Sequence, residues 1–201
     1  MKAAAILLSG GKSSRMGTNK ALLKINEKTN IERIRDELLK VFDEVILVTN
    51  EPEEYRFLQL KTVTDEYPGK GPLAGIHAGL KASSFDANLV VACDMPFVSS
   101  ELGEIMVKNL GHHDAVVPVI EGRQHPLFAV YQKGIAEAAE TCINEGSLRL
   151  KHLFEQLDVL FLTERDLETY SNGSLERIFF NMNKPEEYEL AVQQAKEEES
   201  G

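Results

Sequence analysis

Short apolar runs alternate along the chain with segments in which apolar residues recur every three or four positions. The short runs predict strands, and the recurring spacing predicts helices with one buried face. Strands are expected at Ala3–Leu8, Val45–Val48, Thr62–Thr64, Leu89–Cys93, Ala115–Val119, Leu127–Tyr131, Val159–Leu162 and Ile178–Phe180. Helices are expected at Ile31–Phe42, Pro72–Lys81, from the Ser99 cap to Leu110, at Ile135–Asn144, Leu148–Gln156, and from Pro185 to the end.

This alternation of strands and helices predicts an α/β fold, with one three-layer α/β/α domain over residues 1–201 and a mainly parallel, mixed sheet. The run Leu89–Cys93 is apolar throughout, which is typical of a central strand covered on both faces. In such sheets, ligands bind beyond the carboxyl ends of the strands. A glycine-rich loop, Asn50, Asp65 and Asp94 follow the first four predicted strands in turn, so we expect them to meet in one crevice.

The segment Leu8–Lys20 combines glycines with fixed positive charges directly after the first predicted strand. Its glycines are Gly10, Gly11 and Gly17, and its cations are Lys12, Arg15 and Lys20. Glycines let backbone amides approach an anion closely, and the cations would neutralise that anion. It is not a Walker A loop, because Ile6 stands where that motif needs its first glycine. The segment therefore predicts a polyphosphate loop of another type in a nucleotide-using enzyme, with a plain strand-to-helix turn as the alternative.

Asp94 lies at the end of the predicted central strand, in the segment Val91–Phe97. A carboxylate that leaves a buried strand is costly without a partner. A Mg²⁺ ion shared with substrate phosphates is such a partner, since Mg²⁺ is often held by one or two carboxylates and phosphate oxygens. The alternative is that Asp94 caps a turn.

Three further loops carry polar groups whose role the sequence leaves open. The glycine-rich Pro68–Gly75 precedes a helix and would offer amides to an anion or a base edge, or it is a plain surface connection. Arg123 and His125 would reach a second anionic substrate, or they lie in a solvated hairpin. Asn181 and Asn183 stand at the mouth of the last helix, where capping explains one asparagine but not both.

Transition-metal chemistry is not expected from the sequence. Cys93 and Cys142 fit no zinc motif, and two cysteines cannot build a disulfide framework. The adjacent His112 and His113 have no carboxylate or cysteine at ligand spacing, so they are expected in a loop. Reduced, unpaired cysteines are typical of a cytoplasmic protein.

Charge and composition narrow the range of partners. The 201 residues carry a formal net charge of −10, which disfavours nucleic-acid binding, while a few local cations can still hold a nucleotide. No segment approaches the ~20 apolar residues of a membrane helix, and the N-terminus lacks a cleavage-site pattern. We therefore expect a cytoplasmic protein with no membrane and no nucleic-acid partner.

Read together, five segments resemble the molybdenum cofactor guanylyltransferase family. They are Leu8–Lys20, Gly71–Gly75, Cys93–Phe97, Arg123–Tyr131 and Asn181–Glu187. The resemblance implies a single Rossmann-like nucleotidyltransferase domain and a Mg²⁺-dependent reaction. GTP and molybdopterin, usually carrying molybdenum, would give the guanine dinucleotide cofactor and pyrophosphate. It also suggests, as protein partners, those that insert molybdenum or deliver the cofactor to apoenzymes.

The resemblance also implies roles for individual residues. Leu8, Ser9 and Gly10 would line the guanine nucleotide, Lys20 would bind its phosphates, Asp65 would lie in the nucleotide site, and Asp94 would hold both Mg²⁺ and the nucleotide. We add Arg15 as a phosphate clamp, so that the predicted catalytic residues are Arg15, Lys20 and Asp94. The chain departs from the family at Ser9, where alanine is usual, and at Lys184, where a capping threonine is common.

The expected mechanism is in-line attack by the terminal phosphate of molybdopterin on the α-phosphorus of GTP. Since the nucleophile is already an anion, catalysis would consist mainly of positioning and charge neutralisation. Two alternatives remain from the sequence: a cytidylyltransferase or sugar-phosphate nucleotidyltransferase that shares the opening loop, and a non-catalytic nucleotide-binding module.

Overall fold

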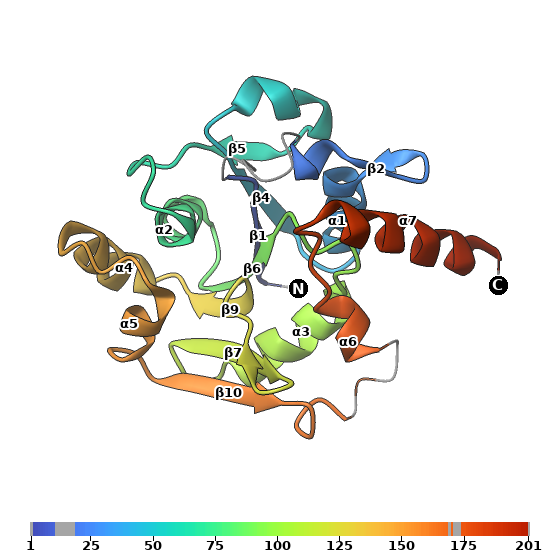
Figure 1. Cartoon of the computed structure of the whole chain (residues 1–201). Coiled ribbons are helices and arrows are strands. Elements are labelled where there is room, and N and C mark those ends of the chain that lie inside the picture. The colour runs from blue at the N-terminus through green and yellow to red at the C-terminus, as the bar shows by residue number, and fades with distance from the viewer. Residues whose placement is uncertain (1, 11–18, 169, 171–173, 201) are drawn as a thin grey trace.

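The computed structural model describes residues 2–10, 19–168, 170 and 174–200, and places an eight-stranded sheet at the centre of the molecule (Figure 1). The strands are β1 (Ala4–Leu8), β4 (Glu44–Val48), β5 (Lys61–Val63), β6 (Ala87–Ala92), β7 (Ala115–Ile120), β8 (Arg123–Gln124), β9 (Phe128–Gln132) and β10 (Val159–Thr163). A separate hairpin joins β2 (Lys24–Ile25) to β3 (Lys28–Thr29).

The sheet order is β10-β7-β9-β6-β1-β4-β5, with β8 paired to β7. Strand β1 runs parallel to both neighbours, with Leu8 opposite Val48 of β4 and Ala92 of β6, and β5 continues the parallel set. Strand β9 is antiparallel to β6 and β7. The predicted α/β fold with a mainly parallel, mixed sheet is therefore confirmed, and the carboxyl ends of β1, β4, β5 and β6 lie side by side.

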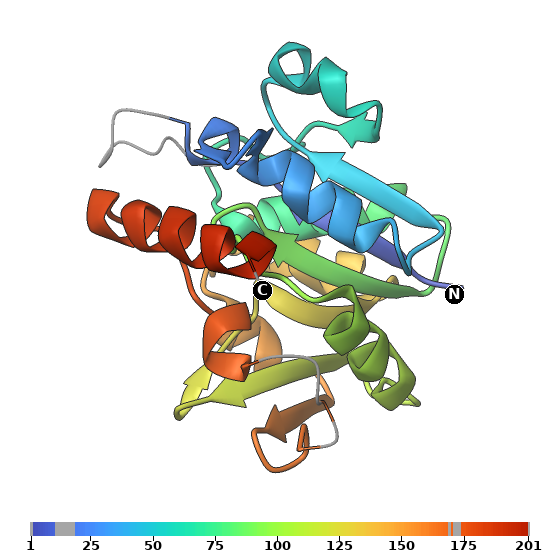
Figure 2. The ribbon, with the colours of Figure 1, turned by 90° about the vertical axis from the view of Figure 1, so that its right-hand side faces the viewer.

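Helices cover both faces of the sheet (Figures 1 and 2). The helices are α1 (Asn30–Leu38), α2 (Pro72–Ala82), α3 (Ser100–Asn109), α4 (Ile135–Asn144), α5 (Leu150–Phe154), α6 (Leu175–Ile178) and α7 (Pro185–Ser200). Helices α1, α3 and α6 bury apolar residues in one core cluster, and α2, α4 and α5 bury theirs in the other. Strand β1 serves both clusters, because Leu7 points to the first and Ile6 to the second.

Local sequence sets the helix starts. Thr29 and Glu32 form a capping box at α1, and the Ser99 hydroxyl accepts the Leu102 amide at α3. Pro72 opens α2, where its missing N–H costs nothing. Two 3-10 helices, η1 (Lys20–Leu22) and η2 (Pro52–Leu58), and the β2–β3 hairpin lie outside the predicted elements.

The predicted strand at Ile178–Phe180 is wrong. Ile178 ends helix α6, and the Phe179 amide donates to the Leu175 carbonyl at 3.0 Å, a helical bond. Three consecutive apolar residues fit a buried strand or a buried helix end equally well, so periodicity could not distinguish them. The predicted helix Leu148–Gln156 also contracts to α5. No helix within the described residues has both the length and the apolar character needed to cross a bilayer.

Gly79 lets α2 approach the central strand closely. A Cβ built at this position would lie 2.3 Å from Cγ2 of the fully buried Ile6. We expect Gly79→Ala to lower the free energy of unfolding by about 1–2 kcal/mol in urea titrations, even though alanine is the better helix former by about 1 kcal/mol. Gly134→Ala is the matched control, because that glycine has φ −59° and nothing within 4 Å of an added Cβ. Equal losses at the two positions would contradict this account of α2 packing.

Candidate active site

The loops that follow four parallel strands are tied together at the carboxyl edge of the sheet. The Ser9 amide donates to the Val48 carbonyl at 2.9 Å, and the Cys93 amide donates to the Leu8 carbonyl at 3.1 Å. The Thr49 amide likewise reaches Val63. The strand ladders thus extend one residue past β1, β4 and β6, and they hold the predicted crevice residues at one edge.

Asp94 sits half-buried in a turn that is held from two sides. Its carbonyl accepts the Met182 amide at 2.8 Å, and the carbonyl of the preceding Cys93 accepts the Asn30 side-chain amide at 2.6 Å. Burial raises the pKa of Asp94 above its ordinary value, while the Lys20 ammonium lowers it and the Glu187 carboxylate raises it. The backbone that carries the carboxylate is therefore held in place and the carboxylate is under-solvated, which favours contact with a cation.

Lys20 joins the opening segment to the last part of the chain. Its Nζ donates to Oδ1 of Asn183 at 3.0 Å, across a separation of 163 residues. Its charge also acts on Asp94. The structure therefore brings Lys20, Asp94 and Asn183 into one group, of which the first two were predicted catalytic residues.

Glu187 organises the start of α7. Its carboxylate accepts the backbone amides of Asn183 and Lys184, as the glutamate of a capping box does. This bond replaces part of the cap that a threonine at position 184 would supply. Asn181, by contrast, makes a local bond to the Phe179 carbonyl at 3.0 Å. Of the two asparagines, one thus serves the turn and the other reaches the site.

The hydroxyl of Ser9 makes a hydrogen bond that the sequence did not predict. Ser9 Oγ donates to the Tyr55 hydroxyl at 2.7 Å, and Asn19 Nδ2 donates to the same oxygen at 2.8 Å. Tyr55 is buried in η2, and this burial raises the pKa of its hydroxyl. Pro52, which begins η2, is the one local sign in the sequence of an ordered segment here. No local pattern links Tyr55 to the glycine loop, so their contact could not be predicted.

The loops that follow β4 and β5 are held in place by hydrogen bonds between side chains and backbone amides. The Asn50 side chain accepts the Asp65 amide at 3.2 Å, and the Asp65 carboxylate accepts the Tyr67 amide at 2.6 Å. Asp65 thus builds a turn at the predicted nucleotide edge. Gly71, with φ +72° before α2, occupies a conformation that favours glycine. Gly75 in the first turn of α2 lies against Leu8, which brings this helix N-terminus to the same edge.

The loop with Arg123 and His125 lies beside the C-terminal segment. The His125 ring is 4.4 Å from the Phe179 ring, and burial together with the Arg123 charge lowers the pKa of His125. Arg123 itself is exposed on β8. The loop is a hairpin, which was one of the two interpretations of its sequence. It places His125 near the C-terminal segment that contains Asn183.

The remaining predicted residues are placed as follows. Leu8 ends β1, with Ser9 buried and Gly10 exposed directly after it. Arg15, with Lys12, Gly11 and Gly17, lies outside the described residues. The sequence missed Tyr55, Asn30 and Glu187, whose contacts join segments distant in the chain or cap a helix through a carboxylate.

Comparison with known proteins identifies the family of the chain. The profile of the MobA-like NTP transferase domain matches residues 5–160. The chain belongs to this family. It is 36% identical over 201 residues to a probable molybdenum cofactor guanylyltransferase of Pelotomaculum thermopropionicum, covering all of this chain and 97% of the relative. A relative of the same description from Clostridium perfringens is 37% identical over 94% of this chain and 96% of its own length.

Solved structures agree with this assignment. Molybdopterin-guanine dinucleotide biosynthesis protein A of Archaeoglobus fulgidus superposes with a TM-score of 0.83 at 26% identity, over 96% of this chain and 99% of the other. The 2-C-methyl-D-erythritol 4-phosphate cytidylyltransferase of Thermus thermophilus shares the fold, with a TM-score of 0.70 at 18% identity over 95% and 98% of the two chains. The chain is therefore a nucleotidyltransferase of the molybdenum cofactor guanylyltransferase family.

Proposed function

We propose that this MobA-like protein transfers GMP from GTP to molybdenum-loaded molybdopterin and releases pyrophosphate. The observation that carries the proposal is the contact of Lys20 Nζ with Asn183 beside Asp94. It joins the loop expected to hold phosphates to the C-terminal segment, where we place Asn183 on the side of the second substrate. Membership of the guanylyltransferase family supports the choice of GTP and molybdopterin.

Asp94 is our proposed ligand for Mg²⁺. A single carboxylate with oxygen donors suits this ion, which commonly completes its shell with substrate phosphates and water. The burial that raises the pKa of Asp94 also fits, because a cation would offset the cost of the buried charge. The bound ion would supply charge neutralisation at the triphosphate.

The chain's own residues would mainly orient and neutralise. Amides of Ser9 and Gly10 would approach the nucleotide, and Lys20, with Arg15, would clamp its phosphates. An oxygen of the molybdopterin phosphate would form the new bond to the α-phosphorus of GTP as the bond to the pyrophosphate oxygen breaks. Both the nucleophile and the leaving group are anions, so no general base is required and positive charge carries the catalysis.

Pyrophosphate release from the purified protein tests the proposal. With Mg²⁺ and molybdate-loaded molybdopterin, we expect release with GTP and little with CTP or ATP, and none without molybdopterin. Selective release with CTP would assign the chain to cytidylyl transfer instead. Nucleotide binding without release from any of the three would favour a non-catalytic module.

We also propose a cytoplasmic setting. Cys142 is buried and Cys93 is half-buried, and both are free, which supports a reducing compartment. The proteins that load molybdopterin with molybdenum or receive the dinucleotide cofactor are the expected partners. The contact with proteins that receive the cofactor can be tested by co-purification. The untagged protein should co-purify with the apo form of a molybdoenzyme more than with the holo form of the same enzyme.

A further inference from the structure

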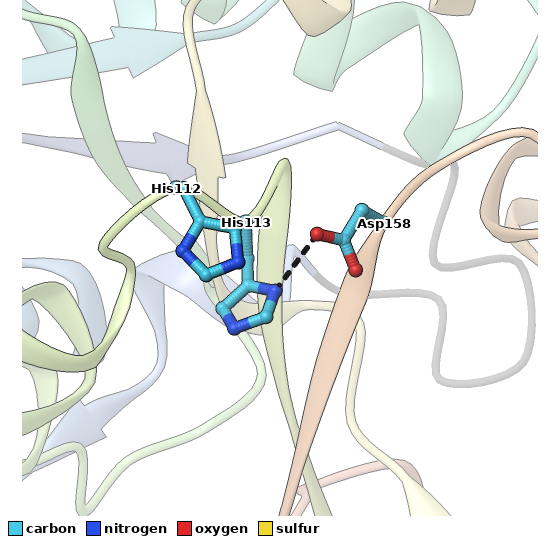
Figure 3. A group of neighbouring side chains, drawn as sticks. All are labelled: His112, His113 and Asp158. Carbon is cyan, nitrogen blue, oxygen red and sulfur yellow. Dashed lines mark hydrogen bonds and ion pairs between the residues drawn. The ribbon is translucent and has the colours of Figure 1, made fainter.

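His112 and His113 meet Asp158 at the edge of the sheet opposite to Asp94. The two histidines lie in the turn between α3 and β7, and Asp158 precedes β10, so all three stand at the amino ends of parallel strands. Figure 3 shows the two rings and the carboxylate turned toward one another. Asp158 follows His113 by 45 residues, so local sequence spacing does not reveal it as a partner of these histidines.

The three side chains are close enough to share one ion. One potential ligand atom from each residue lies within 4.8 Å of the others, and His113 Nδ1 is 3.0 Å from Asp158 Oδ2. Two ligand atoms bound to the same tetrahedral metal at about 2.0–2.2 Å are themselves about 3.3–3.6 Å apart. The hydrogen-bonded His113–Asp158 pair is therefore slightly closer than this spacing, and a metal bound between the two atoms would take the place of the shared proton.

The backbone beneath these side chains is fixed by hydrogen bonds. The Asp114 amide donates to the Asp158 carbonyl at 2.9 Å, and the Asp158 amide donates to the Asp114 carboxylate at 2.9 Å. Gln132 donates its side-chain amide to the His113 carbonyl at 2.8 Å. The scaffold is thus pre-organised, while the exposed His112 and Asp158 keep open the positions that water would fill.

We propose that His112, His113 and Asp158 form a binding site for a divalent transition metal such as Zn²⁺, separate from the active site. Two imidazoles and one carboxylate favour borderline metals over Mg²⁺, which prefers oxygen ligands. Among the described residues, this is the single group of three or more histidine, cysteine or acidic side chains with such geometry. The metal would tie the edge strand β10 to the α3–β7 turn and stabilise the folded state.

Titration of tag-free protein with ZnCl₂ in excess Mg²⁺, followed by calorimetry, tests the site. We expect one Zn²⁺ equivalent whose affinity falls about tenfold or more in each of His112→Ala, His113→Ala and Asp158→Asn. The Tm of the wild type should rise by about 5–10 °C at a hundredfold excess of free Zn²⁺ over Kd. Co²⁺ should give visible absorption bands that the same three variants lose.

His152→Ala is the matched control, because His152 faces Glu155 at 3.4 Å and the described part of the chain offers this pair no third ligand. It should keep the wild-type affinity, and so should Asp94→Asn, which separates this site from the active site. Equal affinity in wild type and His112→Ala, whose exposed side chain can be removed without unfolding the chain, would overturn the proposal. The absence of binding at millimolar Zn²⁺ would overturn it as well.

Discussion

Replacing Asp94 with asparagine should abolish most turnover while making the ligand-free protein more stable. The loss of a pre-positioned charge at a phosphoryl-transfer site typically costs about 10²–10³ in rate, and we expect kcat for pyrophosphate release to fall by this amount. Asp94→Ala should lower kcat for pyrophosphate release by the same amount. Asp86→Asn, at the opposite end of β6, is the matched control and should retain activity, because its exposed side chain lies at the other edge of the sheet.

The stability effect has a defined sign. Burial raises the folded-state pKa of Asp94, so its contribution favours folding below the unfolded pKa and is lost as the pH rises through the folded pKa. At neutral pH the wild type therefore carries a charge that folding disfavours, and asparagine removes it. The Tm of Asp94→Asn should exceed that of the wild type at pH 7, and the two should converge below about pH 4. Near-normal pyrophosphate release by this variant would refute the metal-ligand role of Asp94.

Replacing Lys20 with methionine should lower kcat/KM for GTP by about 10²–10³, because methionine keeps an unbranched stem but removes the charge at the phosphates. The bond from Lys20 to Asn183 is exposed, so the free energy of unfolding should change little. Steady-state pyrophosphate release and urea unfolding on the same preparation measure both quantities.

Lys24→Met is the matched control for Lys20, because Lys24 is exposed on β2, and the hydrogen bond from the Tyr188 hydroxyl goes to its backbone carbonyl. Its side chain should be dispensable. Asn183→Ala adds a second comparison: it removes the partner of Lys20 but not the charge, so its loss should be smaller. Equal losses in Lys20→Met and Lys24→Met would indicate a general effect of net charge rather than a phosphate contact.

The sequence by itself determined most of the order of strands and helices along the chain and the edge at which the polar residues meet, but not the short elements β2, β3, β8, η1 and η2 or the helix end at Ile178. Apolar runs such as Ala4–Leu8 report burial on both faces of a parallel sheet, and the residue that follows each run must lie at its carboxyl end. Asp65 and Asp94 could therefore be placed at one edge without coordinates, although their roles remain predictions. Local signals at Pro72 and Ser99 likewise located the starts of α2 and α3.

Only the tertiary structure decided which distant side chains touch. The periodicity of apolar residues describes burial along one segment and contains no information on how two layers meet. It could therefore not predict the hydrogen bonds from Lys20 to Asn183 and from Ser9 to Tyr55. The same holds for Asp158, which completes the His112–His113 group only because β10 lies beside β7. Ile178–Phe180 shows the same limit: the apolar run was predicted as a strand, but Ile178 and Phe179 are buried at the end of helix α6.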